Sequence, residues 1–244
     1  MMAHAHHFEG GMRENVDELL QKYKTEIGTL RSKVADVFPQ DQPDFYDDLF
    51  VMRFVMTHSK GGKECNFKDA EDALRKTLAW RKQHAELLKR TYDTQKAPNT
   101  DMCEKFNTVG YAGDLGGLEP IFVVRTGHCN SKGLMNSLTA EQVTDWLHFS
   151  REIAFRMCDE RTRKTRTMIK NITIIDLAGW SIFAGDSRFE KCLQKASELS
   201  AIYYPQLLVR NALVTCSTTY LENLVRETAE LMPEHLLLLY LIYY

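Results

Sequence analysis

The chain has 244 residues, of which 44% are hydrophobic, and only 13 glycines and 6 prolines, so its composition is that of a globular protein and excludes a fibrous or largely disordered one. Lys plus Arg number 31 against 33 Asp plus Glu, which excludes the basic excess needed to neutralise a run of nucleic-acid phosphates. The longest uninterrupted apolar stretch is the nine residues 236–244, far short of the about 20 that a membrane-spanning helix needs.

The amino-terminal residues and the cysteines favour a cytoplasmic protein. Residues 1–11 predict a flexible tail with neither the Lys or Arg nor the apolar block of a secretory signal. The six cysteines are spread along the chain without a CxxC pair, a pattern that favours reduced thiols and gives no structural zinc site. We therefore expect no metal and no cofactor.

Residues 12–108 predict a helical amino-terminal lobe. Over 12–37 the apolar positions fall three and four apart, which is typical of one amphipathic helix. Asp44 predicts the cap of a second helix that reaches about His58, and Asn66 predicts the cap of a third. This lobe contains few residues suited to chemistry.

Residues 109–244 predict strands that alternate with helices, and hence an α/β fold with a mostly parallel or mixed sheet covered by crossover helices. The expected elements are a glycine-rich turn over 110–120, a strand over 121–125, a helix with a Thr139–Gln142 capping box, a strand over 168–177, a helix capped by Ser187 with Glu190 that ends near Tyr203, a strand over 210–215 and a last helix over 217–232. The first two strands are apolar on both faces, so helices must cover one face, and either more helices or a ligand the other.

Motifs of common enzymes are missing from the sequence. It contains no P-loop string, no GxGxxG after a strand, no GxSxG elbow and no HExxH pair, and no cysteine is followed at the phosphatase spacing by arginine. We therefore expect no covalent catalysis. Among enzymes, a hydrolase acting through Asp176 and His128 is the disfavoured alternative.

Six short motifs occur in an order that is more specific than any one of them. They are Met52-Arg53-Phe54-Val55, Trp80-Arg81, Glu119-Pro120-Ile121-Phe122, Ile174-Ile175-Asp176-Leu177-Ala178-Gly179, Tyr203-Tyr204-Pro205 and Arg210-Asn211-Ala212. This series resembles the CRAL-TRIO family of lipid-binding proteins. The resemblance implies a helical lobe followed by an α/β lobe, whose sheet floors an apolar cavity closed by a mobile helix.

The resemblance also implies which residues form the site. The expected cavity walls are Phe122, Val124, Thr173, Ile175, Leu199, Tyr203 and Leu213, and the expected gate residues are Tyr220, Leu221, Leu224 and Val225. Asn171 and Lys195 fall in the headgroup region. Asn171 replaces a serine that the resemblance implies for phosphatidylcholine-binding members of the family. Lys195 replaces a glutamate that helps a yeast member to hold inositol, so we do not expect phosphatidylinositol recognition of that type.

Two further segments carry expectations. Arg161, Arg163, Lys164 and Arg166 fall between a helix and a strand, where they predict either contact with anionic lipid headgroups or a solvated loop. The apolar residues 236–244 predict a further strand, a greasy terminal helix or a shortened end, and we favour the strand because an uncovered apolar end would aggregate.

Together these patterns predict a protein that binds one hydrophobic ligand, a phospholipid or another lipophile, in an apolar cavity. It would carry or present this ligand at membranes, through transient contact with the membrane surface, and would catalyse no reaction. The alternative is a module of the same fold that has lost its ligand and acts as a scaffold or membrane adaptor through protein interactions.

Overall fold

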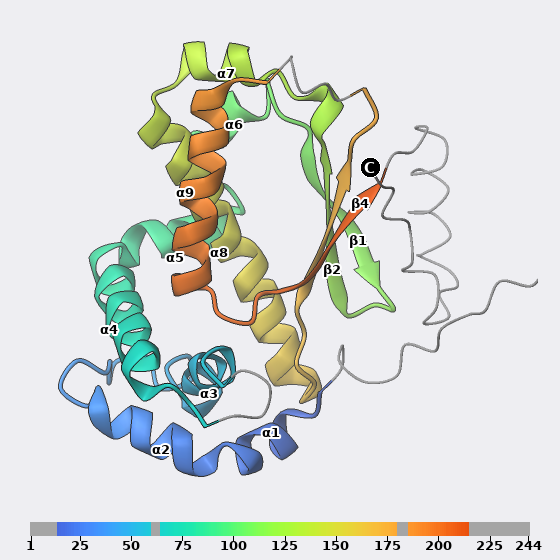
Figure 1. Ribbon diagram of the computed structural model, residues 1–244. Coiled ribbons are helices and arrows are strands. Elements are labelled where there is room, and N and C mark those ends of the chain that lie inside the picture. Colours follow the sequence, from blue (N-terminus) through green and yellow to red (C-terminus); the bar gives the residue numbers. More distant parts are fainter. Residues whose placement is uncertain (1–13, 60–63, 180–184, 215–244) are drawn as a thin grey trace, which may run out of the picture.

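The computed structural model describes residues 14–59, 64–179 and 185–214 (Figure 1). The elements in chain order are α1 (Val16–Lys22), α2 (Lys24–Lys33), α3 (Asp48–Thr57), α4 (Phe67–Gln83), α5 (Ala85–Thr94), α6 (Thr100–Cys103), β1 (Val109–Leu115), β2 (Glu119–Arg125), a short 3-10 turn (Thr126–His128), α7 (Ser131–Ser137), α8 (Ala140–Thr165), β3 (Asn171–Asp176), α9 (Ser187–Tyr203) and β4 (Leu208–Val214).

The described strands form one mixed sheet in the order β1-β2-β3-β4. β1 and β2 are antiparallel, as in a hairpin, whereas β2 and β3, and β3 and β4, are parallel. Parallel neighbours need crossover connections, which α8 provides between β2 and β3, and α9 between β3 and β4. The predicted α/β fold with a mixed sheet is therefore confirmed.

The helices α5, α8 and α9 lie on one side of this sheet (Figure 1). α8 contacts both β2 and β3. Along β3 the side chains of Ile172 and Ile174 are buried, while those of Thr173 and Ile175 are half-buried. Because successive side chains of a strand point to opposite faces, the first pair faces the helices and the second lies on the other face. We call the face that carries Thr173 and Ile175 the open face.

Local signals in the sequence explain where several helices begin. The predicted capping box of α8 is present: the Gln142 N–H donates to the Thr139 hydroxyl at 3.2 Å, and the Thr139 N–H donates to the Gln142 side chain at 2.9 Å. Asn66 caps α4 as predicted, accepting from a backbone N–H of the first turn at 3.3 Å.

Two other predicted caps are wrong. Asp47, not Asp44, caps α3, and Asp186, not Ser187, caps α9. In both cases an aspartate with extended backbone stands immediately before the first helical residue, where its carboxylate accepts from a backbone N–H. The first helix is also shorter than expected, because the stripe over 12–37 is divided at Tyr23 into α1 and α2.

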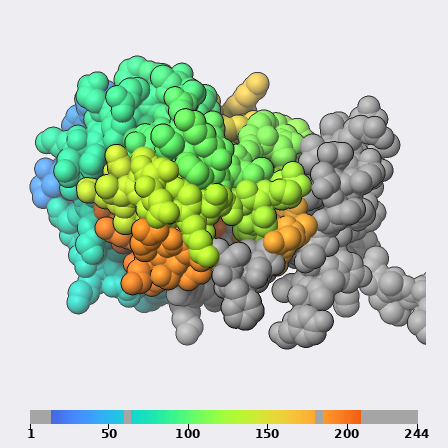
Figure 2. All heavy atoms as spheres, turned by 90° about the horizontal axis from the view of Figure 1, so that it is seen from above, coloured from blue at the N-terminus to red at the C-terminus, as the bar shows by residue number. Residues whose placement is uncertain are grey.

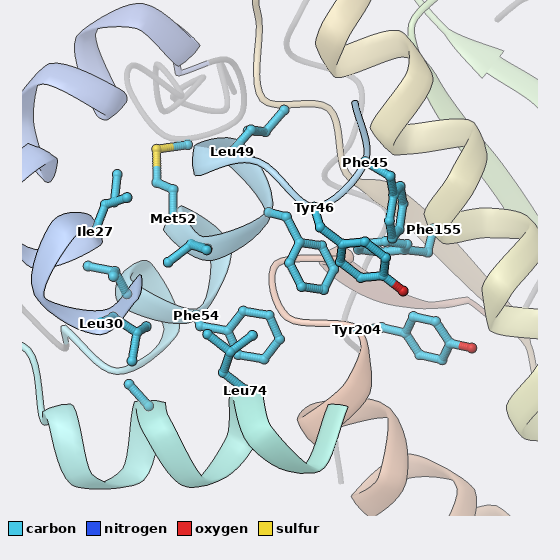
Figure 3. Close-up of a cluster of buried hydrophobic side chains, with 14 of the residues drawn as sticks. Ile27, Leu30, Phe45, Tyr46, Leu49, Met52, Phe54, Leu74, Phe155 and Tyr204 are labelled. Atoms are coloured by element: carbon cyan, nitrogen blue, oxygen red, sulfur yellow. The ribbon is translucent and has the colours of Figure 1, made fainter. Parts of the chain in front are cut away.

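The largest group of buried apolar side chains packs around α3 (Figure 3). Phe50 and Phe54 of α3 are each 1% exposed. The same cluster includes Phe155 of α8 and Tyr204 just after α9. Since this core joins early helices to α8 and α9, the division of the chain into lobes at residues 12–108 and 109–244 stays a prediction.

The carboxyl ends of β2 and β3 lead into α7 and toward α9. α7 contacts α9, and the two helices lie together in the view from above (Figure 2). The predicted tail 1–11, the gate residues Tyr220, Leu221, Leu224 and Val225, the helix over 217–232 and the apolar residues 236–244 lie outside the described residues. Within the described ranges, no helix has the length and apolar character needed to cross a bilayer.

Candidate functional site

The open face of the sheet brings together four of the predicted cavity residues. In the parallel register of β2 and β3, Phe122 pairs with Thr173 and Val124 pairs with Ile175. Residues paired across neighbouring strands point to the same face, so these four side chains form one continuous patch. Leu213 of β4 stands opposite Ile175 in the register of the next strand pair.

The patch continues onto β1, although the glycines over 110–120 predicted a turn there. Val109 pairs with Val124, and Tyr111 pairs with Phe122. The ring centroids of Tyr111 and Phe122 lie 5.9 Å apart, while Val109 and Tyr111 keep 41% and 49% of their surface exposed. The glycines of this segment had suggested a turn, whereas most of it is an edge strand.

A β-bulge in β1 determines which of its side chains reach this face. The register shifts between Tyr111 and Gly113, so that Ala112 is the extra residue of the strand. Gly113 adopts a φ of +112°, a conformation that L-residues rarely take. As a result Asp114 pairs with Pro120 and lies on the same face as Tyr111, although the two are three residues apart.

The open face therefore changes from apolar to polar along the strands. Toward the carboxyl ends of β2 and β3 its residues are Val109, Val124 and Ile175, which are all apolar, and next come Tyr111, Phe122 and Thr173. Toward the amino ends the polar Asp114 and Asn171 lie beside Pro120 and Leu208, so we call this mixed end the polar end. An amphiphile has the same polarity, with apolar chains at one end and a polar group at the other.

Asn171 gives the polar end an unsatisfied group. Its side chain is 7% exposed, and its amide nitrogen donates to the Thr173 hydroxyl at 3.3 Å. Its side-chain oxygen is buried and has no hydrogen-bond partner among the described residues. Buried polar atoms are normally hydrogen-bonded, so this oxygen is an exception among the polar groups of the sheet.

Charged groups meet beside this polar end. The Tyr111 hydroxyl donates to Oδ1 of Asp114 at 2.6 Å, and the Arg161 guanidinium donates to the same oxygen. Arg161 also donates to the Leu118 carbonyl at 2.8 Å. Burial, together with the Asp114 carboxylate, raises the pKa of Tyr111, so its hydroxyl stays protonated and remains a donor.

The other predicted site residues lie on α9, on the helical side of the sheet. α9 packs against α8 and α4. The Tyr203 ring stacks on Trp80 of α4 at 4.5 Å with an interplanar angle of 8°, Leu199 is half-buried, and Lys195 is exposed. The structure thus places Leu199, Tyr203 and Lys195 apart from the open face.

The predicted membrane-contact residues belong to the end of α8 and not to a loop. Arg163 pairs with Asp47 at 2.6 Å and with Asp159 at 2.7 Å. Arg161 pairs with Asp114, as described above, and Arg166, in the left-handed conformation just after the helix, pairs with Asp17. Three of the four basic side chains therefore tie this helix end to other elements, and Lys164 is exposed.

The disfavoured hydrolase pair is separated by a guanidinium. Arg125 lies 3.6 Å from Asp176 and 3.1 Å from the imidazole of His128. His128 thus has a cation as its neighbour, and not the carboxylate that would orient it as a base. Across the described ranges, no group of three or more His, Cys, Asp and Glu side chains has the arrangement to hold a metal ion.

Comparison with known proteins identifies the fold. No family model matches the chain. The structure is similar to the crystal structure of Sfh5, a yeast protein of the CRAL-TRIO family, with a TM-score of 0.50 and 15% sequence identity; the match covers 91% of this chain and 78% of that one. The chain therefore has a CRAL-TRIO-like fold, and the resemblance carried by the six sequence motifs is confirmed at the level of the fold.

Proposed function

We propose that this protein binds a single lipophilic molecule, a phospholipid or a lipid of similar size, with its apolar part against the open face of the sheet. It carries the molecule, or presents it, at a membrane surface and changes no covalent bond in it. The observation that carries this proposal is the gradient of the open face, from Val124 and Ile175 at the apolar end to Asn171 at the polar end.

The hydrophobic effect explains why a lipid needs a protein face to shield it from water. Each methylene removed from water contributes about 0.8 kcal/mol, so a lipid with some 30 chain methylenes resists crossing water by roughly 24 kcal/mol. A face with exposed Val109 and Tyr111 beside half-buried Val124 and Ile175 offers the shielding that this transfer requires. The CRAL-TRIO-like fold is consistent with this use of the sheet.

The polar end of the open face has hydrogen-bonding groups that could contact the headgroup of the ligand. The unpartnered oxygen of Asn171 accepts a hydrogen bond from the ligand, and the neighbouring Thr173 hydroxyl is free to donate one. Lys195 lies on α9, so we leave it out of the proposed headgroup contacts. The gate expected from the family resemblance at Tyr220, Leu221, Leu224 and Val225 stays part of the proposal.

Replacing Ile175 tests the proposal. Ile175→Asp puts a charge in the centre of the apolar row, and desolvating that charge beneath acyl chains opposes binding. We expect uptake of pyrene-labelled phosphatidylcholine from donor vesicles, measured by loss of excimer fluorescence, to fall about tenfold or more. A second variant, Val124→Trp, fills the same row without a charge and is expected to lower uptake too.

The control places the same charge elsewhere on the surface. Leu193 on α9 is 39% exposed, and Leu193→Asp should leave uptake unchanged. Circular dichroism melting curves show whether each variant is folded. Uptake at the wild-type level by folded Ile175→Asp and Val124→Trp would show that the ligand does not lie on this face.

A further inference from the structure

The carboxylate of Asp114 already occupies the place of an anion at the polar end of the open face. Its Oδ1 accepts from the Tyr111 hydroxyl and from the Arg161 guanidinium. These donors come from different elements, β1 and α8, and converge on one oxygen atom. Convergent donors of this kind are how proteins hold the phosphate or carboxylate of a ligand.

The bulge in β1 is what makes this arrangement possible. In a regular strand, residues three apart point to opposite faces, so Tyr111 and Asp114 would be separated by the sheet. The extra residue before Gly113 turns Asp114 to the face of Tyr111, where it stands opposite Pro120. The side chains of Asp114 and Arg161 are 24% and 25% exposed, so this pair is neither fully buried nor freely solvated.

Electrostatics then decides which ligands are accepted. A headgroup with net negative charge would meet the Asp114 carboxylate at the polar end, and like charges brought together disfavour binding. The donors that could compensate that charge, on Tyr111 and Arg161, are already engaged by Asp114. A polar group without net charge meets no such repulsion when it approaches Asn171, whose buried side-chain oxygen has no hydrogen-bond partner among the described residues.

We propose that Asp114 is a specificity-determining residue, which makes the protein select lipids whose polar group carries no net negative charge. This inference rests on the proposed lipid-binding function and names the ligand class of the same site. Tyr111 and Arg161 form a latent anion site, which Asp114 keeps occupied.

Uptake of two labelled lipids from the same vesicles tests the inference. Wild-type protein is offered trace pyrene-labelled phosphatidylcholine or pyrene-labelled phosphatidic acid in phosphatidylcholine vesicles, and we expect it to take up the former preferentially. Asp114→Asn removes the repelling charge and weakens the hold on Arg161. The ratio of phosphatidic acid to phosphatidylcholine uptake should then rise about tenfold.

A double variant identifies the donor that the phosphatidic acid engages. Asp114→Asn combined with Arg161→Gln removes the guanidinium as well, and the ratio should return toward the wild-type value. The matched control is Asp36→Asn, since Asp36 also binds an arginine, Arg75, at 3.0 Å, but on the helical part of the molecule. This control should keep the wild-type ratio.

The outcomes separate this inference from the function on which it rests. Uptake of both lipids with no wild-type preference, or an unchanged ratio in folded Asp114→Asn, would overturn the selectivity while leaving lipid binding intact. Failure of the wild-type protein and of every variant to take up either lipid would overturn the proposed function, and the selectivity with it.

Discussion

At the scale of single residues, His148 has the least ordinary environment outside the open face. Its side chain is 3% exposed, and the ring centroids of Trp80, Tyr203 and Tyr204 lie 4.8, 5.4 and 5.5 Å from its own. Neither ring nitrogen has a hydrogen-bond partner among the described residues. The imidazole thus serves as one ring of an aromatic cluster that joins α4, α8 and the end of α9.

This environment makes the stability of the fold depend on pH. Burial, and then the charges of Arg151 and His84, lower the pKa of His148 from 6.5 to about 4. The unfolded chain therefore binds more protons than the folded one between these values, and stability falls as the pH falls through that window. The contribution of His148, about 3 kcal/mol, is fully present above pH 6.5 and mostly lost at pH 4.

His148→Phe should remove this part of the pH dependence, because it keeps an aromatic ring in the cluster and takes away the titrating group. The measurement is urea unfolding of both proteins at pH 7 and pH 4. We expect the free energy of unfolding of the wild type, relative to that of the variant, to fall by about 3 kcal/mol from pH 7 to pH 4. His128→Asn, at an exposed position, is the control and should behave as the wild type. Equal pH dependence in wild type and His148→Phe would show that His148 is not the titrating group.

At the scale of elements, α8 is the helix to which most of the molecule is attached. Glu152 and Asp159, seven residues apart on one face of α8, bind the buried side chains of Arg81 on α4 and Arg53 on α3. The Arg81–Glu152 pair is bidentate, with distances of 2.9 and 2.7 Å, and both side chains are less than 5% exposed. Such pairs fix how helices meet, since a buried charge without its partner is costly.

Replacing one partner of this pair should therefore lower the free energy of unfolding more than replacing both. Glu152→Gln leaves a buried guanidinium uncompensated and should lower the free energy of unfolding by about 3–5 kcal/mol. The double variant Arg81→Met/Glu152→Leu should lose less free energy of unfolding than Glu152→Gln alone. Urea unfolding measures all three proteins. Asp93→Asn, which breaks an exposed pair with Lys89 on α5, should have almost no effect, and an equally small effect of Glu152→Gln would contradict this role.

Elements with strong periodicity were predictable from the sequence. The capping box of α8 at Thr139 and the two apolar parallel strands around Ile121 and Ile174 are where the patterns indicated, because local propensity and burial favour the same structure there. β1 was not predictable in this way. Glycines at 110 and 113 indicated a turn, whereas pairing with β2 and a bulge make the segment a strand.

The shared face of four candidate site residues was predictable for the same reason. Phe122, Val124, Thr173 and Ile175 share a face because the strand period is two, so identifying the strands was enough to group them. Tyr111 and Asp114 were missed since only the bulge aligns them. Tyr203 was assigned to the cavity, although its place against Trp80 depends on how α9 packs on α4, which no local pattern determines.

At the scale of the whole molecule, the two sides of the sheet differ in role. The charged residues of α8 stabilise the helical side, and the open face is the candidate binding surface. The ion pairs of Arg53, Arg81 and Arg163 with acidic partners hold the helices together on the covered side of the sheet. The other side carries the open face, on which we propose that a lipid binds. Among the described residues, the helices that support the sheet pack on the side opposite to this face (Figure 1).

Native mass spectrometry of the full chain, purified from cells without detergent, tests whether the protein carries one lipid. We expect a species heavier than the polypeptide by the mass of one lipid, which is released by organic extraction, carries no net negative charge on its polar group and is absent from folded Ile175→Asp. A spectrum that contains only the polypeptide mass, before and after incubation with phosphatidylcholine vesicles, would show that the protein binds no such lipid.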